Sequence, residues 1–279
     1  MCYAPFYIRD KFTTQQIPVP CGKCPHCRER RTNGWAFRIT QQLNSKQTTS
    51  AHFITLTYAT DNIPITKGLK TTLKKRDLQL FFKRLRKQYN SKHDTRRIKY
   101  YATGEYGGRT IRPHYHIIVF NASIESISNA WRTTKGAIGH IHFGTVTPAS
   151  IRYSIDYMSK PKIIPQFLGD DRQPEFSLFS KGLGEEYINK QTIKWHKEDL
   201  KNRMYVNIPD GKKVAMPRYY KQKIYKKYEL KMINEQLLAN METETIRLQN
   251  KYPQSMWNES EAKRKAFNKM NSKSNKHTV

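Results

Sequence analysis

The chain has 279 residues and carries 51 Lys or Arg against 22 Asp or Glu, which gives a formal net charge of +29. Together with 17 Tyr, 12 Phe and 4 Trp residues, this excess indicates a polyanionic partner, with nucleic acid as the leading candidate. No apolar run approaches the roughly 18 residues of a spanning helix, and the start of the sequence has no signal-peptide core. The composition therefore argues against a membrane-spanning or secreted protein and predicts one that works in a cytoplasm without a membrane partner.

The length suits one core domain with extensions. We predict that residues 1–50 form a cysteine-bearing segment and a helix, and that residues 51–190 form the core. Residues 191–257 are predicted to form a helical, basic C-terminal extension. Residues 258–279 contain few apolar groups, so we predict a disordered tail there. The expected fold class is α+β.

Three of the four cysteines fall in seven residues, Cys21-Gly-Lys-Cys24-Pro-His-Cys27. A spacing of two residues lets a tight turn aim thiolates at one tetrahedral metal, with Cys2 or His26 as the fourth ligand. We therefore predict a structural Zn²⁺, although reduced, uncoordinated thiols in a basic loop would show the same spacing. A disulfide framework is disfavoured in a chain of this length without a secretory signal.

The next elements are predicted from periodicity. Trp35, Ile39 and Leu43 recur every four residues, as on one face of a helix, and residues 52–58 alternate like a strand rich in β-branched and aromatic residues. A second helix follows Asp77, with its apolar residues at helical spacing. These residues are Leu78, Phe81, Phe82 and Leu85.

The helix behind Asp77 has a basic surface. Residues 67–99 contain 13 Lys or Arg and 2 Asp or Glu, which favours contact with phosphate, although a solvated basic face would have the same composition. The residues that we expect to contact DNA are Lys83, Arg84, Arg86 and Lys87 on this helix, with Arg109 and Arg112 further along the chain.

A β-hairpin is predicted from strand 98–106, a turn through Gly107-Gly108-Arg109, and strand 113–120. In a strand, His114 and His116 point the same way about 7 Å apart, close enough to hold one divalent ion. Folding the hairpin symmetrically about its turn places Glu105 nearly opposite His114, so this carboxylate could complete a metal site. Glu105 could equally be a solvated charge at the hairpin end.

A further strand is predicted over about residues 138–146 and contains a second pair, His140 and His142. The spacing alone cannot distinguish this pair from His114 and His116. Because no nearby acid completes a site, we assign it to a sheet face near the site or to DNA contact. It remains the rival candidate for the metal ligands.

A helix over residues 148–160 has clear boundary signals: Thr147 as N-cap, Pro148 at the first position and Pro161 as the stop. At about 100° per residue, Ile151, Ile155 and Met158 form one stripe. The opposite stripe contains Tyr153, Tyr157 and Lys160. Tyrosines at this spacing are often packing residues, but here a separate face already supplies the packing.

This combination of residues suits DNA cleavage by tyrosine. A phenol, with a pKa near 10, is a poor nucleophile at neutral pH, so the scissile phosphate must be polarised. An ion held by His114, His116 and Glu105 would do so. Attack by tyrosine yields a phosphotyrosine ester and a free 3′ hydroxyl, and the ester can later be rejoined without ATP. We expect Tyr157 to attack first, because Lys160 lies one turn away and can stabilise its phenolate.

These motifs resemble those of HUH endonucleases that initiate rolling-circle replication, and more closely those of the replication initiators of single-stranded DNA microviruses of gokushovirus type. The resemblance covers about residues 18–184 in family order. It rests on Pro20-Cys-Gly-Lys-Cys24, Phe53-Ile-Thr-Leu-Thr-Tyr58, Arg76-Asp-Leu-Gln-Leu-Phe-Phe82, Gly104-Glu-Tyr-Gly107, Arg112-Pro-His-Tyr-His116, Thr147-Pro-Ala-Ser150 and Tyr153-x3-Tyr157-x2-Lys160. One departure is Tyr115, which fills a position usually described as hydrophobic.

The resemblance implies a central antiparallel sheet flanked by helices, with the metal site on the sheet face below the tyrosine helix. It implies an initiator that nicks the origin of a small phage DNA, forms a 5′-phosphotyrosine link and uses its two tyrosines alternately to release circles. The implied cofactor is Mg²⁺ or Mn²⁺. The implied partners are single-stranded origin DNA and the host helicase and polymerase, in the cytoplasm of a bacterial host.

Two other classes compete with this interpretation. A non-catalytic module that binds single-stranded nucleic acid would explain the charge and the aromatic residues, but not a tyrosine-lysine face opposite the core. A relaxase or transposase shares the chemistry, although relaxases usually place the tyrosine before the histidines. Metal-dependent nicking with a covalent adduct separates the enzymes from the binding module, and repeated release of circles identifies the initiator.

Overall fold

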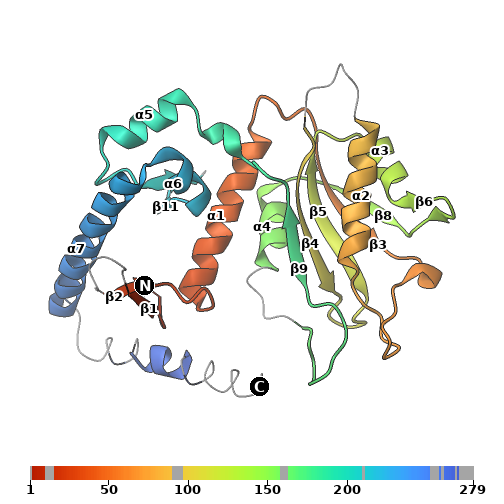
Figure 1. Ribbon diagram of the computed structural model, residues 1–279, viewed down its shortest axis with the longest axis horizontal. Coiled ribbons are helices and arrows are strands. Elements are labelled where there is room, and N and C mark those ends of the chain that lie inside the picture. The colour runs from red at the N-terminus through yellow and green to blue at the C-terminus, as the bar shows by residue number, and fades with distance from the viewer. Residues whose placement is uncertain are drawn as a thin grey trace. The chain divides into compact units, whose positions relative to one another are not determined.

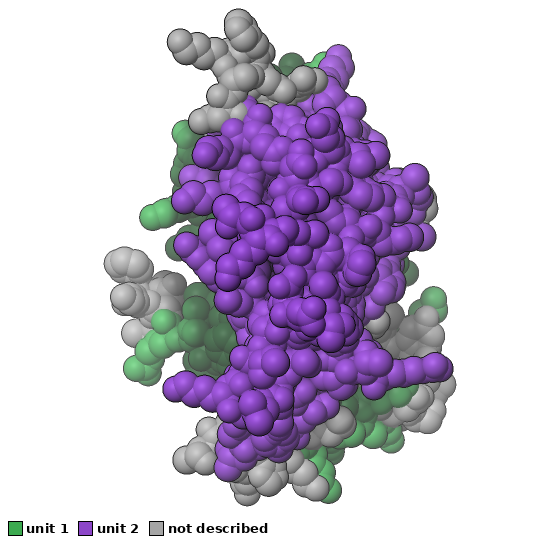
Figure 2. Space-filling view, turned by 90° about the vertical axis from the view of Figure 1, so that its right-hand side faces the viewer, with its two compact units in different colours: residues 1–34, 188–279 green, residues 35–187 purple. Residues whose placement is uncertain are grey.

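The computed structural model describes residues 2–9, 16–89, 97–157, 163–208, 211–251, 258, 261–267 and 269. The chain divides into two compact units, which are coloured differently in Figure 2: residues 35–187 form one, and residues 1–34 with 188–279 form the other. Each unit combines helices with antiparallel strands. The predicted α+β class is confirmed.

The 35–187 unit is built on a five-stranded antiparallel sheet with the strand order β8-β3-β5-β4-β9. The strands are β3 (Ala51–Thr57), β4 (Lys99–Tyr106), β5 (Pro113–Phe120), β8 (Ile141–Thr145) and β9 (Phe176–Phe179). β5 lies at the centre and β4 beside it, which explains why nearly every residue of these two strands is buried. The strands predicted at 52–58, 98–106 and 113–120 are confirmed to within one residue at either end.

Helices α2 (Lys75–Gln88) and α3 (Ile124–Ala130) cover one face of the sheet (Figure 1). The apolar positions predicted for α2 are all buried: Leu78, Phe81, Phe82 and Leu85. They pack in one core with the β3 and β5 side chains that alternate toward this face, which include Ile54, Leu56, Tyr115 and Ile117. This layer accounts for most of the core of the unit.

Helix α4 (Pro148–Asp156) and the C-terminal half of α1 (Pro25–Leu43) contribute to the core on the other face. Ile39 from α1 and Ile151 and Ile155 from α4 pack there. Their partners in the sheet are Tyr101, Ile118 and Phe120, with Leu183 from the loop after β9. The same face of β4 and β5 therefore carries apolar residues at one end and, because side chains alternate, Glu105, His114 and His116 at the other.

A network of hydroxyl groups ties β5 to the start of α2 on the α2 side of the sheet. The Tyr115 hydroxyl lies 2.7 Å from that of Tyr58, accepts a hydrogen bond from the Lys74 N–H at 3.0 Å and lies 3.0 Å from the Lys74 carbonyl oxygen. Tyr58 donates to Asp77 at 3.0 Å. Burial raises the pKa of Tyr115 to about 12, so it remains a neutral phenol. This explains how the motif accommodates an aromatic residue between its histidines.

Tyr115→Phe is expected to lower the free energy of unfolding by about 1–3 kcal/mol, because it leaves the partners of the hydroxyl group without their hydrogen bonds. Denaturant unfolding of the metal-free protein measures the change. Tyr228→Phe is the matched control, because Tyr228 is 60% exposed. Equal stability of the two variants would show that the Tyr115 network contributes nothing.

The unit made of residues 1–34 and 188–279 contains two small hairpins and three helices besides the N-terminal half of α1. The hairpins are β1 (Phe6–Arg9) with β2 (Gln16–Val19) and β10 (Tyr205–Asn207) with β11 (Lys213–Ala215). The helices are α5 (Lys190–Glu198), α6 (Arg218–Ile224) and α7 (Lys227–Lys251). The predicted C-terminal extension is thus largely helical. Of the predicted tail, residues 258, 261–267 and 269 are described, as helix, and the others lie outside the described residues.

Short elements complete the fold: η1 (Thr60–Asn62), the pair β6 (Arg132–Thr133) and β7 (Gly136–Ala137), and η2 (Glu185–Tyr187). The loop before η2 is held from inside the unit. The Lys99 ammonium group donates to the carbonyl oxygens of Lys181 and Gly182, and the Arg38 guanidinium group donates to that of Leu183. Across the described ranges, no helix combines the length and apolarity needed to cross a membrane.

Candidate active site

Glu105, His114 and His116 converge on the sheet face that carries α4. Glu105 pairs with His114 across the β4–β5 ladder, so the predicted register of the hairpin is confirmed. Nε2 of His114 lies 2.9 Å from Oε1 of Glu105, and Nε2 of His116 lies 2.6 Å from the same oxygen. The candidate ligand atoms of the three residues lie within 4.8 Å of one another. The cluster could hold one metal ion.

The second nitrogen of each ring is already held by a neighbour. Nδ1 of His114 lies 3.1 Å from the Arg112 carbonyl oxygen, and Nδ1 of His116 lies 2.9 Å from Oγ1 of Thr55. Contacts of this kind fix the orientation of a metal-binding imidazole. They leave both Nε2 atoms turned toward Glu105. The pair is therefore oriented as metal ligands would be.

The environment of Glu105 also fits a cation. Its residue is only 3% exposed, and Oε2 is a buried atom without a hydrogen-bond partner among the described residues. Burial alone would raise the pKa of Glu105, but the hydrogen bonds from His114 and His116 outweigh it and hold the pKa below its ordinary value. For His114, burial would lower the pKa, and the bond to Glu105 raises it instead. A buried carboxylate with one unused oxygen remains for a positive ion.

The tyrosine helix begins as predicted. Thr147 and Ser150 form a capping box, and Pro148 occupies the first position of α4. Ile151 and Ile155 are buried on the core side. The helix reaches Asp156, and Tyr157 forms its C-cap. Residues 158–160, which complete the predicted helix and include Met158 and Lys160, lie outside the described residues.

Both tyrosine rings lie against His116. The ring centroids are 5.2 Å apart for Tyr153 and His116, and 5.8 Å apart for Tyr157 and His116, whose rings stack. Tyr153 is 44% exposed. The Tyr157 hydroxyl donates a hydrogen bond of 2.7 Å to the Tyr153 hydroxyl oxygen. The structure thus brings both predicted nucleophiles to the predicted metal ligands.

The two phenols are not equivalent. Burial raises the pKa of Tyr157, and the hydrogen bond to Tyr153 and the charge of Glu105 raise it further. Tyr153 receives that hydrogen bond, which would stabilise a negative charge on its oxygen. Within the described residues, this arrangement favours Tyr153 as the first nucleophile. The sequence-based preference for Tyr157 depends on Lys160, whose place the structure does not describe.

Sequence reasoning missed the supporting residues of the site. Thr55 contacts His116 from β3, and the ring of Phe53 stacks on His116 with its centroid 5.6 Å away. The signal for them was present, because both residues lie on one face of the predicted 52–58 strand. What the sequence could not show was that this face pairs with His116 in the neighbouring strand.

The rival histidines lie elsewhere on the sheet. His142 pairs with Thr55, which pairs in turn with His116, so His142 lies on the same sheet face two strands away from His116. His140 precedes β8, and its carbonyl oxygen accepts a hydrogen bond from the Thr57 N–H. Both are exposed. Among the described residues, neither belongs to a group of three candidate metal ligands.

The predicted DNA-contacting residues do not gather at the cluster. Lys83, Arg86 and Lys87 are exposed on α2, which covers the opposite face of the sheet (Figure 1). Arg84 donates to the Ala130 carbonyl oxygen. Arg112 donates to that of Tyr58, and Arg109 is exposed in the β4–β5 turn. If α2 contacts DNA, it does so at a distance from the reaction.

Comparison with known proteins identifies the family. Residues 51–162 match the family model of the replication-associated protein ORF2. The chain is 31% identical over 224 residues to the replication-associated protein VP4 of Bdellovibrio phage phiMH2K, which covers 75% of this chain and 67% of that protein. The chain belongs to the phage replication-associated protein family. The resemblance to microvirus initiators predicted from the sequence is confirmed.

Two further phage replication-associated proteins are similar to this one. The identity is 26% to ORF2 of Spiroplasma virus 4, over 76% of this chain and 69% of that protein. It is also 26% to ORF4 of Chlamydia phage 1, over 75% of this chain and 54% of that protein. No solved structure matches the chain. The region of the family model contains the metal-ligand cluster and both tyrosines.

Proposed function

We propose that this replication-associated protein initiates rolling-circle replication by nicking single-stranded origin DNA with a tyrosine. One observation carries the proposal: Tyr153 and Tyr157 both lie against His116 of the Glu105, His114 and His116 cluster. Membership of the phage replication-associated family supports the same role.

In the proposed reaction, a tyrosine hydroxyl oxygen attacks the scissile phosphorus while the bond from phosphorus to the 3′ oxygen breaks. The phenol gives up one proton and the leaving 3′ oxygen gains one, so the step is balanced. The products are a 5′-phosphotyrosine ester and a free 3′ hydroxyl. Because the ester keeps the energy of the broken linkage, a later attack by a 3′ hydroxyl rejoins DNA without ATP.

The chain's own residues orient the reaction. Thr55 and the Arg112 carbonyl group hold the imidazoles, and α4 places both phenols over one of them. Glu105, His114 and His116 would hold Mg²⁺ or Mn²⁺, which withdraws charge from the phosphate oxygens when bound. Two imidazole nitrogens with one carboxylate favour Mn²⁺, since Mg²⁺ prefers oxygen ligands.

The second phenol gives the proposed enzyme a way to finish the cycle. With one tyrosine linked to the 5′ end, the other can cut the regenerated origin, and the freed 3′ hydroxyl then closes the first strand into a circle. The host helicase and polymerase would unwind and extend the strand between the two cuts. The hydrogen bond between Tyr153 and Tyr157 supports this exchange, because it holds both oxygens at the same place.

A labelled-substrate assay tests the proposal. Oligonucleotides tiled along the genome that encodes the chain are incubated with the protein and either Mn²⁺, Mg²⁺ or a chelator. We expect a label at the 3′ end to migrate with the protein on a denaturing gel and a label at the 5′ end to appear on a shorter free strand. Mn²⁺ should act at lower concentration than Mg²⁺. Cleavage without an adduct, or an adduct that carries the 5′ label, would contradict the tyrosine mechanism.

A further inference from the structure

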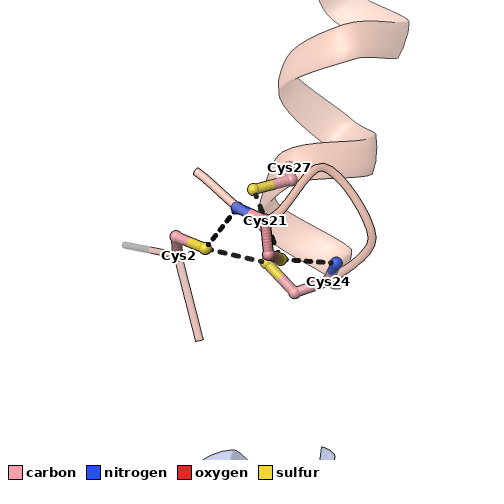
Figure 3. A group of neighbouring side chains, drawn as sticks. All are labelled: Cys2, Cys21, Cys24 and Cys27. Atoms are coloured by element: carbon pink, nitrogen blue, oxygen red, sulfur yellow. Dashed lines mark hydrogen bonds between the residues drawn. The ribbon is translucent and has the colours of Figure 1, made fainter. Parts of the chain in front are cut away.

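All four cysteines of the chain meet at one place in the unit formed by residues 1–34 and 188–279 (Figure 3). Cys2 comes from the segment before β1, and Cys21 and Cys24 come from the turn after β2. Cys27 lies in the first turn of α1. None of these residues takes part in the proposed nicking reaction. The cluster therefore needs an explanation of its own.

The sulfur positions suit a single ion. The four Sγ atoms lie within 4.8 Å of one another, with 4.0 Å between Cys21 and Cys27 and 3.9 Å between Cys2 and Cys24. A tetrahedral site with zinc–sulfur bonds of about 2.3 Å separates its sulfurs by about 3.8 Å. A disulfide would need about 2.05 Å. An iron–sulfur cluster places several metal atoms between its ligands and would hold the sulfurs further apart.

Backbone amides point at the sulfurs, as they do around thiolates. The N–H groups of Lys23 and Cys24 donate to Sγ of Cys21 at 3.4 and 3.3 Å, and the N–H group of Cys21 donates to Sγ of Cys2 at 3.2 Å. The turn can adopt this shape because Gly22 has a φ of +72°, which favours glycine. A neutral thiol is a weak acceptor, so three donors favour the charged form.

Charge nearby supports the same form. Cys24 immediately precedes α1 and Cys27 lies in its first turn, where the positive end of the helix dipole stabilises thiolates. Four thiolates around a divalent ion carry a net charge of −2. The surrounding sequence is basic at Lys23, Arg28 and Arg31, and Arg31 donates to the Gly22 carbonyl oxygen at 3.2 Å.

The candidate ligand His26 is placed differently. Its ring packs edge-on against Tyr3, with the centroids 4.9 Å apart, and it does not belong to the group of converging ligand atoms. Cys2 takes the fourth position instead. The site therefore joins residues on both sides of the β1–β2 hairpin, since Cys2 precedes β1 and Cys21 follows β2.

We propose that Cys2, Cys21, Cys24 and Cys27 bind one structural Zn²⁺ that closes the base of the β1–β2 hairpin onto the start of α1. The hairpin has few other means of support, since Phe6, Tyr7 and Ile8 are 53%, 59% and 48% exposed. A two-stranded hairpin with so little packing is marginal in water. The bound ion supplies the cross-link that the missing core would otherwise provide.

Elemental analysis and thiol counting test the site on the full chain. Protein purified under reducing conditions without chelator should contain about one zinc per chain and negligible iron. Its thiols should react slowly with a thiol reagent, and chelator should expose all four together. No further cysteine exists to obscure the count. Co²⁺ exchanged into the site should give the absorption of tetrahedral thiolate coordination.

Two variants test the ligand set and the hairpin. His26→Ala should keep its zinc, whereas Cys24→Ser should retain less than about a tenth of it. Cys2→Ser keeps three ligands, so α1 should stay folded while amide exchange in residues 6–9 and 16–19 speeds up at least about tenfold. Chelation of the wild-type protein should have the same effect on the hairpin.

Several outcomes would overturn the proposal. Loss of zinc in His26→Ala, with retention in Cys2→Ser, would assign the fourth position to His26. Stoichiometric iron, or a mass lower by two hydrogens per cysteine pair without metal, would replace zinc with another chemistry. Four freely reactive thiols and no metal in folded wild-type protein would leave only a thiol loop. None of these results would alter the nicking assay, so the two proposals fail separately.

Discussion

Replacing His114 and His116 together with alanine should lower the rate of adduct formation on origin DNA at least about a thousandfold. The reason is that the variant loses two of the three ligands of an ion that would supply several kcal/mol of charge stabilisation, and each 1.36 kcal/mol corresponds to a tenfold change in rate. Binding of the oligonucleotide should change little, because phosphate contacts dominate affinity. Single-turnover cleavage and filter binding measure the two effects separately.

A second variant and a matched control sharpen this test. Glu105→Gln keeps the shape of the buried side chain but removes its charge, so it should weaken Mn²⁺ binding, measured directly by calorimetry. His142→Ala removes an exposed imidazole from the same sheet face two strands away, and should retain most of the wild-type rate. If His142→Ala loses cleavage while the double variant keeps it, we have assigned the wrong pair.

The double variant Tyr153→Phe with Tyr157→Phe should form no covalent adduct, because no phenol would remain beside His116. Each single variant should still form an adduct on a short origin oligonucleotide. Neither single variant should complete repeated rounds of circle release, because one tyrosine is occupied while the second cut is made. Mass spectrometry of the digested adduct identifies the linked residue in each case.

The order of the two tyrosines can be read from the same variants. If the hydrogen bond from Tyr157 activates Tyr153, the adduct of the wild-type protein should form mainly on Tyr153, and Tyr157→Phe should slow it. If the charge of Lys160 dominates, the first adduct should form on Tyr157, and Lys160→Gln should slow it. Circle release by Tyr153→Phe at the wild-type rate would instead mean that the enzyme uses a single tyrosine.

The central hairpin could be predicted from sequence because three local signals agree on its register. The glycine turn sets the symmetry, strand alternation sets the faces, and together they put Glu105 opposite His114, as found. The start of the tyrosine helix was predictable for the same reason, since Thr147 and Pro148 are local signals. Local chemistry therefore determined the parts of the candidate site that lie within one hairpin or one helix.

Other features escaped prediction because their signals are weak or not local. Helix α1 begins at Pro25, ten residues before the predicted start, since residues 25–34 carry no apolar stripe and periodicity finds only the buried half. The β1–β2 hairpin has four-residue strands without a buried face. The support of His116 by Thr55 depends on which strands become neighbours, which a single sequence does not state.

The central position of β5 also makes the site resistant to sliding. β5 is hydrogen-bonded on both sides, to β3 along Ala51–Thr57 and to β4 along Lys99–Tyr106. A shift of one residue would turn both histidines into the apolar layer under α2 and send Tyr115 to the DNA side. Two borders would have to break at once for that to happen. The spacing of the imidazoles is therefore guarded by the whole sheet, and changes in the β4–β5 turn should alter its length without detuning the metal ligands.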